Sequence, residues 1–112
     1  MEFSRSAAKA AARYGDCITC SALLNPVSAE AYALLGDTEG ARSHAAAAGR
    51  AAAMFPSSAW RAMAETSDGS AKVAEGDRAG ARAAFEAAAD HYEAAGQPYW
   101  AARTRDRARA FL

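Results

Sequence analysis

A repeat of 40 residues constrains the fold of this chain more than any other feature of its sequence. Shifting the chain by 40 residues aligns GDTEGAR (36–42) with GDRAGAR (76–82) and places Trp60 on Trp100. Alanine matches carry little weight because 35 of the 112 residues are alanine, but matched glycine, aspartate, arginine and tryptophan remain. A repeat of this length predicts units that bury their apolar side chains only against a stacked neighbour.

The composition indicates that these units are helical. Alanine is the best helix former, whereas valine and isoleucine, which favour strands, together number only three. The chain length suits one domain. We therefore expect an all-α fold, a right-handed α-solenoid of stacked antiparallel helical hairpins with a repeat of about 40 residues.

Turn residues predict where the helices begin and end. Gly36 and Gly76 suit the left-handed end of one helix, and the aspartate after each suits the start of the next. Ser57 or Ser58 and then Pro98 mark two further helix starts. Pro26 lies inside one expected helix, where we expect a kink or a break. The six expected helices span 3–14, 17–35, 38–55, 58–75, 78–95 and 98–111.

The same punctuation divides the single domain, 1–112, into repeats. We expect a half-repeat (3–16), two repeats (17–56 and 57–96) and an end helix (97–112). Such an array begins and ends on a helix without its hairpin partner. The chain is therefore expected to be a fragment of a longer array, or to form a homodimer through its exposed end helices.

Apolar spacing predicts which face of each helix is buried. The expected buried stripe of helix 17–35 contains Cys20, Leu23, Leu24, Val27, Ala31 and Leu34. One repeat later it contains Trp60, Met63, Ala64, Ser67, Ala71 and Ala74. Two further stripes contain Ala41, Ala45 and Ala48, and Ala81, Phe85, Ala88 and Tyr92.

The charge pattern excludes some partners. The 13 basic and 13 acidic residues cancel, so we expect no direct binding of nucleic acid or of an anionic membrane. No run is long and apolar enough to cross a bilayer, and a cytoplasmic location is expected. The arginines at 103, 105, 107 and 109 fall into two pairs on different sides of the last helix, and we expect them to solubilise it.

The run AEGDRAGARAAFEAAADHYEAAGQPYWAAR (74–103) resembles a tetratricopeptide-type helical hairpin. Gly76, Ala81, Phe85 and Ala88 have the spacing of that family's second-helix pattern, whereas Glu65 and Asp68 replace its large apolar residues. RYGDCITCSALL and AAGQPYWAARTR resemble the alanine-rich repeats of large actinobacterial LuxR-like or SARP-like regulators. The resemblance implies the regulatory module of a larger bacterial transcriptional regulator; its nucleotide-binding and DNA-binding motifs do not occur in this chain.

Cys17 and Cys20 form a Cys-x-x-Cys pair at the expected start of helix 17–35. A helix N-terminus favours the thiolate, so Cys17 is the more reactive candidate for a redox switch. A closed zinc site needs four ligands, and the expected topology keeps His44 and His91 about 20 Å away. Zinc binding would then require the cysteine pairs of two chains. Core packing, a redox role and a metal-linked role all stay open.

Two polar rows suggest a groove for a protein or peptide partner. We expect Ser21, Asn25, Ser28 and Tyr32, together with Arg61, Glu65, Asp68 and Lys72, to line one wall of it. The sequence has no Gly-rich phosphate loop, nucleophile elbow or His-rich metal motif, so we expect no enzyme and no cofactor. The expected function is a protein–protein interaction scaffold. The alternatives are a thiol-redox or metal-responsive sensor, and a small-ligand receptor near Tyr32 and Trp60.

Overall fold

The computed structural model describes residues 23–111 as an all-helical structure. No strand occurs in this range, which confirms the expected all-α class. The helices are α3 (Leu24–Leu34), α4 (Thr38–Met54), α5 (Ser58–Glu75), α6 (Arg78–Ala94) and α7 (Pro98–Arg109). The expected helix 3–14 lies outside the described residues, as does the start of the expected helix 17–35. Within residues 23–111, no helix has the length and apolar character that a bilayer crossing requires.

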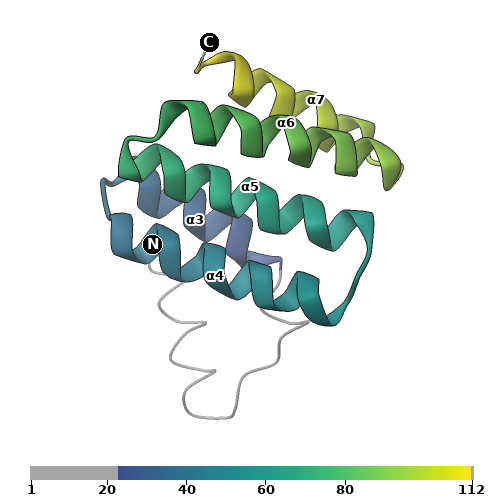
Figure 1. Ribbon diagram of the computed structural model, residues 1–112, viewed down its shortest axis with the longest axis horizontal. Helices are drawn as coiled ribbons and strands as arrows, with labels where there is room; N and C mark the ends of the chain where they lie inside the picture. The colour runs from purple at the N-terminus through teal and green to yellow at the C-terminus, as the bar shows by residue number, and fades with distance from the viewer. Residues whose placement is uncertain (1–22, 112) are drawn as a thin grey trace.

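Successive helices run antiparallel and stack side by side (Figure 1). α3 packs against both α4 and α5, while α5 also packs against α4 and α6. α7 follows α6 at the opposite end of the stack from α4 (Figure 1). Helical hairpins therefore pack on each other along the chain, and α3, α5 and α7 run in the same direction.

The helix boundaries follow the predicted turn residues closely. Gly36 and Gly76 adopt positive φ angles of 75° and 81°, a region that is costly for residues with a Cβ atom. The Asp37 and Asp77 carboxylates then accept hydrogen bonds from the backbone N–H groups of Gly40 and Gly80, both at 2.9 Å. Ser57 caps α5 in the same way, and Pro98 opens α7 as expected.

Pro26 does not interrupt the described helix. α3 begins at Leu24, so Pro26 lies in its first turn. Backbone N–H groups in the first turn have no intrahelical acceptor, and proline removes no helical hydrogen bond there. The described part of this helix therefore continues through Pro26, and the residues before Leu23, where a break would separate the rest of the expected helix 17–35, lie outside the described range.

The interior is built mainly from alanine and other small residues. Ala41, Ala45 and Ala48 of α4 are buried, as expected. The expected stripe of α6, including Phe85 and Tyr92, is buried as well. Because alanine side chains are short, neighbouring helices approach closely and exclude water with little side-chain volume.

Phe85 is the largest fully buried side chain among the described residues. It lies against the backbone of α5 at Gly69, where an added Cβ atom would be 2.6 Å from the phenyl Cε1. One repeat earlier, the equivalent positions hold Ala29 and Ala45, and both are buried. The two hairpins thus fill equivalent positions differently, one with two alanines and the other with a glycine and a phenylalanine.

The expected buried stripe of α3 was wrong. Leu23, Val27 and Leu34 are 73%, 64% and 82% exposed, whereas Asn25, Ser28 and Ala29 are buried. The reason is steric: α3 packs closely on α4 and α5, so small side chains occupy that contact and the larger ones lie outside it. On α5, Ser67 and Ala71 are buried as expected, while Trp60, Met63, Ala64 and Ala74 are only partly buried.

Candidate functional site

The polar residues predicted to form a groove wall on α3 lie largely inside the structure. Asn25 and Ser28 are 4% and 1% exposed, so they cannot form a solvent-facing wall. The Asn25 side-chain oxygen lies 3.1 Å from His44 Nδ1 on α4. The Tyr32 ring stacks on His44 with 5.5 Å between ring centroids and packs over Gly40. Ser21 lies outside the described residues.

Two of the four predicted wall residues on α5, Glu65 and Asp68, are paired with neighbouring helices. Glu65 Oε2 lies 2.8 Å from His91 Nδ1 on α6. Asp68 forms ion pairs with Arg42 on α4 at 2.7 Å and with Lys72 at 2.9 Å. Only Arg61 among these four is exposed to solvent. The Glu65 and Asp68 pairs therefore join helices to each other, and these two carboxylates are not free to bind a partner.

The Asp68 ion pairs also set the protonation of their members. Partial burial raises the pKa of Asp68, but hydrogen bonds from Arg42 and Lys72 outweigh it and hold this pKa below its ordinary value. The hydrogen bonds that Arg42 donates to Glu75 and Asp68 raise the pKa of Arg42. Both shifts favour the charged forms of Asp68 and Arg42, as a structural ion pair requires.

The exposed apolar side chains of α3 instead face α7 across the surface of α5. We call this surface the groove: α3 and α7 form its walls, and α5 forms its floor. At one end lies a hollow of about 360 Å³ with a mainly apolar lining. It is lined by Leu23, Pro26, Val27, Ala59, Met63, Tyr92, Gln97 and Trp100.

A second hollow, of about 200 Å³, lies at the other end of the groove. The same three helices line it, together with the residues that follow α7. Its lining residues are Glu30, Ala33, Leu34, Ser70, Val73, Arg107, Ala110 and Phe111. Each hollow thus contains exposed apolar side chains from α3, and the charged residues Glu30 and Arg107 line the second one.

A charged cluster of Glu30, Arg103 and Arg107 joins the walls of the groove. Arg103 Nη2 lies 3.4 Å from Glu30 Oε1, and Arg107 Nη1 lies 3.7 Å from Glu30 Oε2. Arg107 also donates a 2.8 Å hydrogen bond from Nη2 to Ser70 Oγ on the floor. Two guanidinium groups therefore share one carboxylate.

Arg107 is the most deeply placed charge of this cluster. Its side chain is 19% exposed, and its guanidinium carbon lies 4.3 Å from the centroid of the Phe85 ring. Burial lowers the pKa of Arg107 from its ordinary value, and the nearby carboxylate of Glu30 partly compensates. Its Nη1 atom is buried and has no hydrogen-bond acceptor among the described residues. Buried polar atoms are normally hydrogen-bonded, so this one is an exception.

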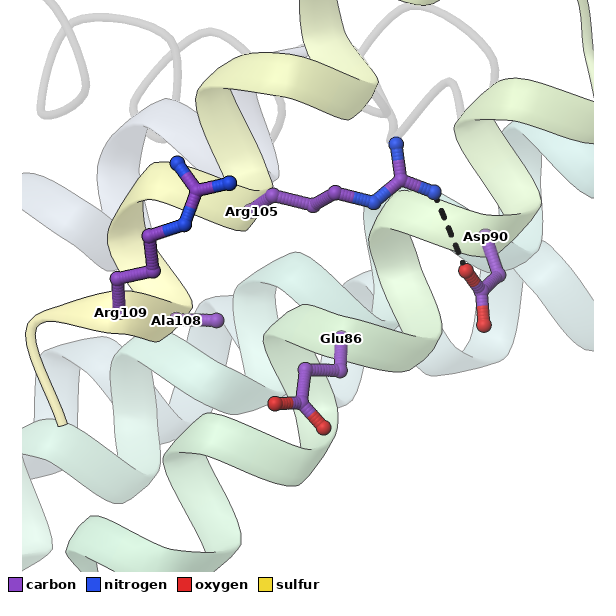
Figure 2. A pocket seen from close by; sticks show the side chains of 5 residues that line it. All are labelled: Glu86, Asp90, Arg105, Ala108 and Arg109. Atoms are coloured by element: carbon purple, nitrogen blue, oxygen red, sulfur yellow. Dashed lines mark hydrogen bonds and ion pairs between the residues drawn. The ribbon is translucent and has the colours of Figure 1, made fainter. Parts of the chain in front are cut away.

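Arg105 and Arg109 lie on another side of α7, which confirms that the four arginines form two pairs. They line a hollow of about 360 Å³ between α6 and α7 with Glu86, Asp90 and Ala108. Figure 2 shows Arg105 reaching from α7 toward Asp90, to which it is ion-paired at 3.3 Å. Arg105 also pairs with Glu93 at 2.8 Å. The charges of this hollow compensate one another and form an ordinary solvated surface.

The described residues do not form a metal site. Between residues 23 and 111, no group of three or more histidine, cysteine, aspartate or glutamate side chains is placed to hold a metal ion. Cys17 and Cys20 lie outside this range, so their predicted redox or zinc-linked roles stay predictions.

Sequence reasoning placed Arg103 and Arg107 in one pair but missed the cluster that they form with Glu30. Arg103 and Arg107 are four residues apart on α7, and their spacing alone places them on one face. Glu30 is 73 positions away from Arg103. Only the packing of α3 and α7 on either side of α5 brings these charges together.

Comparison of the chain with protein-family models, curated proteins and solved structures found no match.

Proposed function

We propose that the chain is a protein–protein interaction scaffold that binds a peptide segment of its partner in the groove between α3 and α7. The observation that carries the proposal is the exposure of Leu23, Val27 and Leu34 along one stripe of α3. Apolar patches rimmed by polar groups are typical of sites where proteins bind each other.

Four of the large apolar side chains that are exposed among the described residues line the two hollows of the groove: Leu23, Val27, Leu34 and Trp100. Exposed apolar side chains gather at its two ends, where Trp100 and Phe111 of the opposite wall meet those of α3. Covering them removes apolar surface from water, which favours association. The charged cluster, of which Glu30 and Arg107 line the second hollow, supplies the polar contacts that fix the register of a bound segment.

We propose that the described hairpins belong to a right-handed, tetratricopeptide-like solenoid and that the groove is its inner face. The antiparallel stacking of α3 to α7 supports this arrangement. The resemblance of two sequence stretches to actinobacterial regulators further supports a regulatory module of a larger bacterial transcriptional regulator. The scaffold would then bind another protein directly and affect transcription through that contact.

Selection from a random peptide display library tests the groove as a binding site. The wild-type chain is the bait, and selected peptides are then measured against Val27→Glu. This substitution places a charge in the apolar hollow, and we expect roughly tenfold or greater loss of affinity. Ala83→Glu is the matched control because Ala83 is exposed on α6, outside both hollows of the groove.

Peptides that bind the wild type and Ala83→Glu equally but lose affinity for Val27→Glu would support the proposal. The proposal would fail if the selection returned no peptide, or if the selected peptides ignored Val27→Glu.

A further inference from the structure

The charged cluster of the groove has an excess of positive charge. Arg103 and Arg107 face a single carboxylate, that of Glu30. Glu30 lies within ion-pair distance of both arginines but is 3.4 Å or more from each. Strong charge-assisted hydrogen bonds are shorter, at about 2.7–2.9 Å. Glu30 therefore satisfies the two guanidinium groups only weakly.

Arg107 also lacks a hydrogen-bond acceptor for one of its donor atoms, Nη1. Its Nη2 donates to Ser70, but the buried Nη1 donates no hydrogen bond to any described residue. A guanidinium group recognises a carboxylate best through two parallel N–H donors. A second carboxylate that displaced Glu30 would supply the acceptor that this arginine lacks.

The apolar contacts on either side define the rest of the partner. Val27 and Leu34 lie seven residues apart on α3, with Glu30 between them. Along a helix this separation is about 10 Å, because each residue rises 1.5 Å. A partner helix matches this spacing if it carries two apolar side chains two turns apart and one acidic side chain midway between them.

From this charge complementarity and spacing, we propose that the groove receives an acidic amphipathic helix of a partner protein. One carboxylate of that helix binds Arg103 and Arg107 between two apolar side chains. In the free chain, Glu30 stands in for this carboxylate and competes with it. The inference deepens the proposed function and rests on it, since it names the chemistry of the segment that the groove would bind.

Two synthetic peptides test the role of the carboxylate without altering the protein. Each is a fluorescent, helix-forming peptide with two leucines two turns apart; one carries glutamate midway between them, and the other carries glutamine there. We expect the wild-type chain to bind the glutamate peptide roughly tenfold more tightly in fluorescence anisotropy. Raising the salt concentration reduces this preference. Equal affinity for the two peptides overturns the inference.

Variants of the cluster then test which residues recognise the carboxylate. Arg103→Gln and Arg107→Gln remove the preference for the glutamate peptide. Glu30→Gln increases affinity for the glutamate peptide and leaves affinity for the glutamine peptide unchanged, because it removes only the competitor. If Glu30 only held the helices together, Glu30→Gln would weaken binding of both peptides, and the inference would fall. Thermal unfolding of each variant shows whether it is folded at the assay temperature.

The outcomes separate this inference from the proposed function. If both peptides bind equally and Val27→Glu abolishes both, groove binding stands and the role of the carboxylate falls. If neither peptide binds while library-selected peptides depend on Val27, the partner chemistry is wrong and the interaction scaffold stands. If the library selection fails as well, both proposals fall.

Discussion

The two faces of α3 differ in the size of their side chains and in how far these are buried. The face toward α4 and α5 carries Asn25, Ser28 and Ala29, all at most 4% exposed. The face toward the groove carries Val27 and Leu34, which are more than half exposed. Small residues therefore build the interior, and large apolar residues lie where a partner can reach them.

The same contrast continues on α5. Its buried residues are Ala62, Thr66, Ser67, Gly69, Ser70 and Ala71, whereas the bulkier Met63 lines the groove. The hydroxyl groups of Thr66 and Ser67 donate hydrogen bonds to backbone carbonyls of their own helix, both at 2.8 Å. This local pairing lets small polar side chains occupy an interior position without an unsatisfied donor. On α3 and α5, the buried side chains are thus small, and the large apolar side chains are exposed or only partly buried.

The prediction with the largest expected effect removes Phe85, the largest fully buried side chain among the described residues. Phe85→Ala should lower the free energy of unfolding by about 3–5 kcal/mol, because it leaves a cavity against Gly69. Chemical denaturation followed by circular dichroism measures the change. A loss below about 1 kcal/mol would show that the α5–α6 contact does not depend on this ring.

Gly69→Ala tests how closely the helices approach. An added Cβ atom would lie 2.6 Å from the Phe85 ring, and overpacking of this kind should cost about 1–3 kcal/mol of unfolding free energy. Gly49→Ala is the matched control: Gly49 is an exposed helical glycine with no atom within 4 Å of an added Cβ. That substitution should stabilise the chain by about 0.5–1 kcal/mol. Equal effects of the two substitutions would contradict the close contact.

His44 of α4 lies against Asn25 and Tyr32 of α3, and we expect it to make the free energy of unfolding depend on pH. Burial lowers the pKa of His44 from its ordinary value of 6.5, so the unfolded chain binds this proton more readily than the folded chain. The contribution of His44 is fully present above pH 6.5 and is lost as pH falls through the folded pKa. Urea unfolding at several pH values should show a steeper loss of stability below pH 6.5 for the wild type than for His44→Gln. If the free energy of unfolding fell equally with pH in both proteins, burial of the His44 ring would not affect its protonation, because water would reach the ring.

The smallest effects are expected in the groove. Val27→Ser and Leu34→Ser should each change the free energy of unfolding by no more than about 0.5 kcal/mol, because both side chains are already exposed. Ala29→Val, on the inner face of the same helix, should destabilise by about 1–3 kcal/mol through overpacking. If the serine variants were the more damaging ones, the assignment of the two faces would be reversed.

The sequence predicted the helices of the described region well because their signals are local. Glycine after a helix and aspartate at the next N-terminus act within a few residues, and Asp37 and Asp77 occupy their predicted places. The helix face was harder to predict. Hydrophobic spacing identified the apolar stripe of α3, but it did not show that the close packing of α3 would exclude Val27 and Leu34 from the interior.

The groove could be predicted only in outline. The sequence indicated that α3 and α5 contribute to it, but not that Asn25 and Asp68 would pair with α4. The charged cluster depends on the separation of α3 and α7, which packing sets. Arg103 and Arg107 were recognised as a pair, but Glu30 was not recognised as their partner.

The division between small interior residues and large groove residues has an evolutionary consequence. Substitutions at positions such as Val27, Met63 and Trp100 change the lining of the groove while the alanine contacts of the interior stay untouched. Under the proposed function, recognition would then diverge among descendants of this chain faster than architecture, and a new target would not require an unfolded ancestor.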